Sequence, residues 1–233
     1  MWIYLGLLSA LFLGIYNICK KHSVSNNAVL PVLCLSTFTS FLVSSPLLIA
    51  SRLELEYIRH STFYIPSLSI ELHLLIFIKS AIISSSWLLA FHALKHLPLT
   101  IVAPIRSAGP FFTLIGAVFL FQERPNPKQW LGLIIVLLSV FLYSYVGKKE
   151  GIQFRKNKWI HAIILATLLG SSSGLYDKFL IQDHQLNAQS VLTWFSFYSC
   201  LIFTSIFFII RKPQTPHDFR WRWSIPAVGV LYV

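Results

Sequence analysis

A series of apolar runs, each about long enough to cross a lipid bilayer, constrains this sequence more than any other feature. A hydrocarbon core of about 30 Å needs about 20 helical residues, at about 1.5 Å per residue. An eighth run begins near Trp223 and reaches Val233. Seven complete runs precede it: Trp2–Cys19, Ala28–Ala50, Leu72–Leu94, Leu99–Phe121, Trp130–Val146, Trp159–Leu180 and Ser190–Ile210. The sequence therefore predicts an all-α, multi-pass membrane protein whose consecutive helices are antiparallel neighbours.

Composition supports this class. The chain is 55% hydrophobic and 12% charged, whereas soluble domains carry about 25% charged residues. The net charge of +11 comes from basic residues in short connectors, where orientation signals and contacts with anionic lipids belong. We therefore expect the lipid bilayer, and no nucleic acid, as a partner. No cleavable signal precedes the first run, so Trp2–Cys19 is interpreted as a retained helix. The connector from Ala50 to Leu72 is charged and predicts a surface turn of helix.

The run Leu99–Phe121 contains two prolines, Pro104 and Pro110, and one charge, Arg106. A membrane helix tolerates such residues where neighbouring helices or a wet cavity satisfy the freed backbone groups and the ion. This pattern is typical of a kinked helix that lines a pathway. The glycines Gly109, Gly116 and Gly132 are predicted to let helices approach closely.

The stretch around this run carries a family resemblance. It reads ALKHLPLT, then AP, then SAGPFFTLIGAVFLFQERPNPKQWLGLIIVLLSV. An Ala-Leu pair and a proline corner precede a helix with a mid-span proline, and a Glu-Arg corner leads into a glycine-containing helix. This order resembles the EamA domain of the drug/metabolite transporter superfamily, well over Leu72–Val146 and weakly elsewhere. The resemblance implies ten helices in two five-helix halves, and a transporter without specifying its solute.

An internal repeat is consistent with two halves. Shifting the sequence by 160 positions brings Gly14-Ile15-Tyr16-Asn17 onto Gly174-Leu175-Tyr176-Asp177, and Asn27-Ala28 onto Asn187-Ala188. Five helices separate equivalent points, so the second unit would enter the membrane in the opposite direction, as in the inverted repeats of transporters. We predict a first five-helix repeat over 1–147, a basic connector over 148–158 and the start of a truncated second repeat over 159–233.

Two orientations remain open. Basic residues are concentrated in the connectors of the face opposite the N-terminus, so the positive-inside rule places the N-terminus outside. The family resemblance implies that the N-terminus is inside. Either way, we expect a multi-pass protein of the bacterial inner (plasma) membrane.

Charges within spans are the strongest candidate site residues, because each costs at least about 2.5 kcal/mol at mid-bilayer unless it is paired or hydrated. Two interpretations are open for Arg106. It faces a central cavity and holds an anionic group through paired hydrogen bonds, or it snorkels or binds backbone freed by Pro110. Lys79 and Asp177 approach from the same face, so they are candidates for an ion pair that acts as a gate or proton-linked couple. Otherwise Asp177 is interfacial and Lys79 snorkels.

Aromatic and polar side chains at repeat-related positions complete the candidate pathway. They are Tyr16 and Asn17, with their counterparts Tyr176 and Asp177, and Trp87, on whose face an organic molecule would stack. The competing interpretation makes the tyrosines interface anchors. Ser84, Ser85 and Ser86 are predicted to allow close helix packing.

No residue pattern supports an enzyme. The sequence has no P-loop or nucleophile–base arrangement, and its three cysteines have no metal or redox spacing. We therefore expect no catalytic residues, no metal and no cofactor.

The predicted function is secondary-active transport of a small organic metabolite, such as an amino acid or another anionic or zwitterionic solute, by alternating access. A homodimer is one candidate assembly. The alternative is a truncated or partner-dependent membrane protein without transport activity of its own.

Overall fold

All regular structure in the part of the chain that the structure describes is helical. A computed structural model describes residues 2–59, 61–149, 156–209 and 219–232. Its helices are α1 (Trp2–Val24), α2 (Val29–Arg52), α3 (Glu56–Arg59), α4 (Ile70–His96), α5 (Leu99–Ser107), α6 (Gly109–Phe121), α7 (Pro127–Lys149), α8 (Lys158–Gln182), α9 (Ala188–Ile209) and α10 (Ser224–Tyr232). The predicted all-α class is confirmed. The short α3 is the surface turn expected between Ala50 and Leu72.

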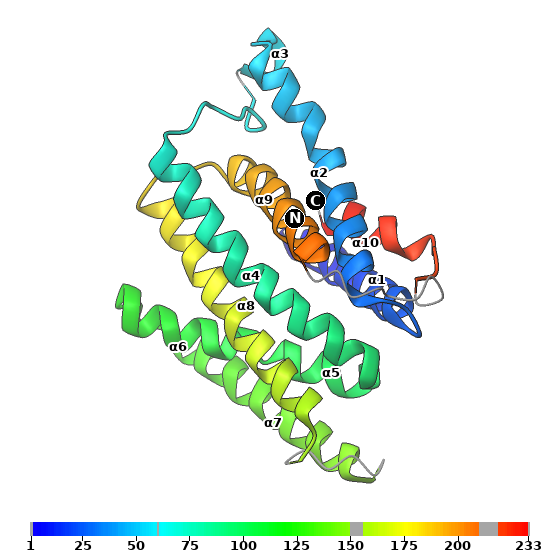
Figure 1. Cartoon of the computed structure of the whole chain (residues 1–233). Helices are drawn as coiled ribbons and strands as arrows, with labels where there is room; N and C mark the ends of the chain where they lie inside the picture. The colour runs from blue at the N-terminus through cyan, green and yellow to red at the C-terminus, as the bar shows by residue number, and fades with distance from the viewer. Residues whose placement is uncertain (1, 60, 150–155, 210–218, 233) are drawn as a thin grey trace.

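Two long helices, α4 and α8, lie side by side along the middle of the molecule (Figure 1). Helices α5 and α6 pack on one side of this pair, and α7 packs against α5 and α6. On the other side, α9 packs against both α2 and α4, and α10 packs against α1 and α2. Segments that are distant in sequence, such as α1 and α10, therefore become direct neighbours.

Five segments among the described residues are long and apolar enough to cross a membrane. They are Val29–Arg52, Ile70–His96, Leu99–Phe121, Lys158–Gln182 and Ala188–Ile209. Helices α1 and α7 cover the other two predicted spans, Trp2–Cys19 and Trp130–Val146, and their crossing stays a prediction. Most of the predicted connector 148–158 lies outside the described residues.

Apolar side chains cover the outside of the bundle, and both apolar and hydroxyl side chains fill its interior. Large apolar residues such as Leu11, Phe119 and Leu138 are exposed, as suits contact with lipid. Between helices, Ser86 Oγ donates to the carbonyl of Ala166 at 2.6 Å. Lipid tails are as apolar as leucine, so small residues that allow close approach hold membrane helices together. The prediction that this serine run serves helix packing is confirmed at Ser86.

The proline-containing span is broken in two. Helix α5 ends at Ser107, α6 begins at Gly109, and Ala108 forms the turn between them. Pro110 has no N–H to donate to the carbonyl of Arg106 four residues earlier, and its ring disfavours helical backbone at Gly109. The break therefore lies next to Pro110, whereas α5 continues through Pro104.

The corner after α6 folds against the end of α8, where Glu123 pairs with Lys178. One glycine differs from the sequence-based expectation. Gly132 has nothing within 4 Å of an added Cβ, so its predicted role in close helix contact is wrong. Gly116, in contrast, packs directly against Leu175.

Candidate solute cavity

Residues of six helices line a cavity of about 270 Å³. Three of the predicted pathway residues line it: Tyr16 of α1, Trp87 of α4 and Arg106 of α5. Its wall is completed by α8, which contributes Thr167, Gly170 and Ser171, and by residues of α1, α4, α6 and α10, namely Leu13, Lys20, Ile83, Gly109 and Tyr232. The cavity is at the small end of ligand pockets in proteins, which span about 300–1,000 Å³, and so suits a small metabolite.

Arg106 reaches the cavity from the broken span. Its Nη1 lies 3.3 Å from the carbonyl oxygen of Ala166 and 3.5 Å from Ser86 Oγ. Both partners are neutral, and guanidinium has five N–H donors. Among the described residues, the donors other than Nη1 have no hydrogen-bond partner. Arg106 lines the cavity, and its backbone partner belongs to α8 rather than to the span that Pro110 interrupts. The predicted contact of Arg106 with an anionic group stays a prediction.

Lys20 is a second cation at the same cavity, and the sequence analysis missed it. The predicted first span stopped at Cys19, whereas α1 continues to Val24 and places Lys20 inside a helix, 5% exposed. Its Nζ lies 4.2 Å from the ring centroid of Tyr16, one turn earlier along α1, and 5.7 Å from that of Phe91. The side chain thus extends back toward the middle of the helix. Its assignment to a connector was wrong.

The neighbouring Lys21 has a different environment. Its Nζ donates to the carbonyl oxygens of Leu94 at 2.5 Å and Leu97 at 2.7 Å, at the end of α4. Adjacent residues on a helix point in directions about 100° apart. Lys21 therefore binds the carbonyl groups at the end of α4, whereas Lys20 faces the cavity.

Aromatic rings form one wall of the cavity. The ring of Trp87 meets that of Tyr232 edge to face, with centroids 4.7 Å apart, and that of Phe195 at 5.6 Å. Tyr16 and Tyr232 lie 6.3 Å apart. Such edge-to-face contacts fix the ring orientations. Tyr232 is another lining residue that sequence reasoning missed, because only the packing of α10 against α1 brings it here.

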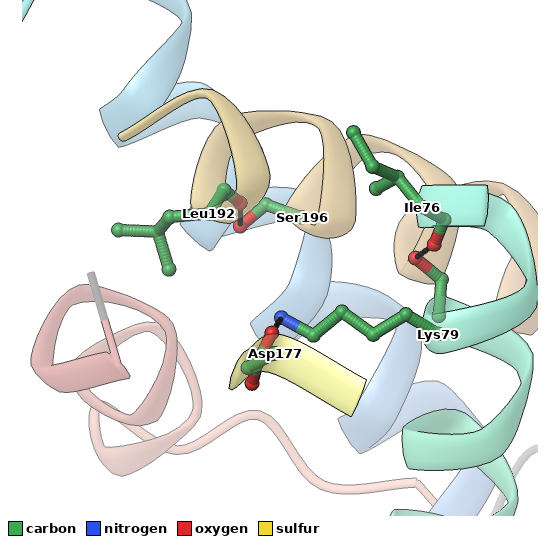
Figure 2. Close-up of polar contacts among 6 residues, drawn as sticks. Ile76, Lys79, Asp177, Leu192 and Ser196 are labelled. Atoms are coloured by element: carbon green, nitrogen blue, oxygen red, sulfur yellow. Dashed lines mark hydrogen bonds and ion pairs between the residues drawn. The ribbon is translucent and has the colours of Figure 1, made fainter. Parts of the chain in front are cut away.

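An ion pair lies beside this aromatic wall. Lys79 Nζ of α4 is 2.6 Å from Asp177 Oδ1 of α8, and the two side chains point toward each other in Figure 2. The pairing predicted from topology is confirmed. Lys79 Nζ also lies 4.7 Å from the ring centroid of Phe195, which in turn contacts Trp87. The buried cation of this pair is thus one aromatic ring away from the cavity wall.

The other two predicted pathway residues lie apart from the cavity. Asn17, next to Tyr16 on α1, is half-buried and does not line it. Tyr176 packs against Phe179 of its own helix, at a centroid distance of 5.6 Å, and does not line it either. Their pathway roles stay predictions.

Comparison with known proteins identifies the family. The model of the EamA-like transporter family matches residues 1–145, more than half of the chain. The chain belongs to the EamA-like transporter family. The resemblance inferred from the proline corner and the Glu-Arg corner is thereby confirmed, and the chain is an integral, multi-pass membrane protein.

One curated relative of this EamA-like chain is a protein of Synechocystis sp. named as an uncharacterized transporter. The two are 25% identical over 150 residues, a match that covers 61% of this chain. The same match covers 41% of the Synechocystis protein, so the chain aligns with less than half of that relative's length. Together, the family and this relative support a membrane transporter.

Proposed function

We propose that this EamA-like protein is a secondary-active transporter of a small organic solute, an amino acid or another anionic or zwitterionic metabolite, in the bacterial inner membrane. The observation that carries the proposal is the small cavity between α1, α4, α5, α6, α8 and α10, with Arg106 in its wall. A cationic side chain inside a membrane bundle is expensive and is kept where it serves a solute or ion pathway.

Alternating access between two inverted halves is the proposed mechanism. The 160-residue shift exchanges α1 with α8 and α2 with α9, and by chain order α4 with α10. Helix α4 packs against α8 as α10 packs against α1, and α4 packs against α9 as α10 packs against α2. Such an exchange of neighbours is what a two-fold axis in the membrane plane requires, and it supports the proposal.

The Lys79–Asp177 pair is proposed to act as a gate. It joins α4 to α8 through groups that separate if those helices move apart, and Phe195 links it to the cavity wall. An energy source in the form of an ion or metabolite gradient would drive the movement.

Counterflow in proteoliposomes tests the proposal without assuming a coupling ion. Vesicles that contain the 233-residue chain would be loaded with an unlabelled pool of amino acids and organic acids and then offered the same solutes in labelled form. We expect labelled solute to accumulate transiently, and Arg106→Gln to reduce the initial rate by roughly tenfold or more, as loss of a charge-assisted contact predicts.

Substitution of the exposed Lys95 by Gln is the matched control and should leave the rate unchanged. Absence of counterflow with every solute would favour the alternative, a protein that depends on a partner for transport.

A further inference from the structure

The described cavity is lined by two cations and no anion. Lys20 and Arg106 both face it, and none of its lining residues is acidic. Among the described residues, neither cation has a carboxylate within ion-pair distance. The carboxylate on the adjoining helix α8, Asp177, is engaged by Lys79.

This imbalance is unfavourable while the cavity holds no anion. Two positive groups that line one cavity repel each other, and the largely apolar helices around them screen that repulsion poorly. The ring faces of Tyr16 and Phe91 attract the ammonium of Lys20, but they carry no charge that would neutralise it. A negatively charged solute that contacts both cations relieves the repulsion.

We propose that the cavity selects organic anions with a planar apolar group and discriminates against the zwitterions and cations of the same carbon skeleton. This inference rests on the proposed function and narrows it, because it names the solute class. Arg106 supplies paired donors suited to a carboxylate, and Lys20 supplies the second charge. The edge-to-face pair Trp87 and Tyr232 offers the apolar wall.

The cavity is expected to discriminate against zwitterions because a zwitterion carries an additional ammonium group. Its ammonium group would enter the same space as two cations, without an acidic side chain in the wall to receive it. An unpaired charge in such a site costs both desolvation and repulsion. The matched anion lacks only that group, so its affinity is expected to be higher.

Binding of four matched compounds to the purified chain tests this inference. Phenylpropionate is the anion, phenylalanine the zwitterion, phenethylamine the cation and phenylpropanol the neutral compound. We expect phenylpropionate to bind by isothermal titration calorimetry with a Kd at least roughly tenfold below that of phenylalanine, and phenethylamine to show no binding. Equal or tighter binding of phenylalanine or phenethylamine would overturn the inference, as would absence of phenylpropionate binding by folded protein.

Single substitutions test whether Lys20 and Arg106 are responsible for the binding of phenylpropionate. Lys20→Met and Arg106→Gln are each expected to weaken phenylpropionate binding roughly tenfold or more and to narrow the difference between anion and neutral compound. Lys20→Arg retains the charge and should retain most of the affinity, while the exposed Lys95→Gln should leave it unchanged. Far-UV circular dichroism and size-exclusion chromatography establish that each variant is folded. Anion affinity that survives both Lys20→Met and Arg106→Gln would also overturn the inference.

The binding result is separable from the counterflow result. Counterflow of zwitterions with phenylalanine as the preferred ligand would retain the transporter and reject the anion preference. Selective binding of phenylpropionate without counterflow of any solute would retain the cavity and reject transport by this chain.

Discussion

At the residue scale, the charges within the helices have two kinds of environment. Lys79 has a carboxylate partner at 2.6 Å and an aromatic ring beside it. Lys20 and Arg106 have rings, a hydroxyl and a carbonyl as neighbours, but no carboxylate among the described residues. The charge of Lys79 is therefore neutralised by a carboxylate of the protein. The charges of Lys20 and Arg106 are not, which leaves both cations able to pair with an anionic solute.

Asp177→Asn removes the partner of a lysine whose side chain is 8% exposed. We expect it to destabilise the protein by about 2 kcal/mol, below the 3–5 kcal/mol of a fully buried pair, because the Asp177 side chain is 36% exposed. Thermal unfolding in detergent measures the loss.

A double variant separates the ion pair from local packing. Lys79→Met combined with Asp177→Asn should be more stable than Asp177→Asn alone, because no buried charge is left without a partner. If the losses of stability in the two single variants simply add in the double variant, the two side chains contribute independently.

At the scale of helices, the apolar runs were sufficient to predict most elements. Bilayer-length runs located the long helices, and Pro110 located the break at Ala108, since both signals are local in the sequence. The end of α1 was misplaced, because Lys20-Lys21 has the composition of a connector. Carbonyls of α4 that bind Lys21, and rings that contact Lys20, sustain the helix to Val24. Tyr16 lies only one turn from Lys20, but Phe91, Leu94 and Leu97 are distant in sequence and gave no local signal.

Gly229 sets how closely α10 approaches α2. A Cβ at this position would collide with the backbone carbonyl of Ser36, and would lie 2.8 Å from Thr39 Cβ and 3.0 Å from the backbone nitrogen of Ser40. Backbone has little room to move, so Gly229→Ala should displace α10 and lower stability by about 1–3 kcal/mol.

Gly132→Ala is the matched control for Gly229→Ala in a thermal unfolding experiment. It adds a methyl group where nothing lies within 4 Å, and alanine is the better helix former by about 0.5–1 kcal/mol. Its unfolding midpoint should stay the same or rise. A similar fall in both variants would contradict the assigned role of Gly229.

At the scale of the whole molecule, two asparagines each bind a segment that is distant in sequence. Asn27 donates through Nδ2 to the carbonyl of Arg220 and accepts through Oδ1 from its N–H, both at 2.8 Å, just before α10. Asn187 donates to the carbonyl of Tyr64 at 2.5 Å, in the segment before α4. The sequence predicted that the two asparagines are equivalent. It did not predict their partners, because these depend on the packing of the completed fold.

Hydrogen exchange tests this correspondence with crossed variants. Asn27→Ala removes the two hydrogen bonds to Arg220, at about 1 kcal/mol each, together with the local bonds to Ser23 and Ala28. It should speed exchange in residues 219–232 while leaving 61–70 unchanged. Asn187→Ala should have the opposite pattern. Faster exchange in the same segment for both variants would argue against two separate attachments.

The wall of the cavity also gives the protein an intrinsic optical reporter. The chain has seven tryptophans, and of those that the structure describes Trp87 alone lines the cavity. Indole emission depends on the polarity and charge around the ring, so a solute that displaces water there should alter the fluorescence of Trp87. Trp87→Phe should abolish the change while the other tryptophans still emit. Trp87 fluorescence then reports whether a solute occupies the cavity. This measurement needs no label, works in detergent or in vesicles, and does not require the solute to cross the membrane.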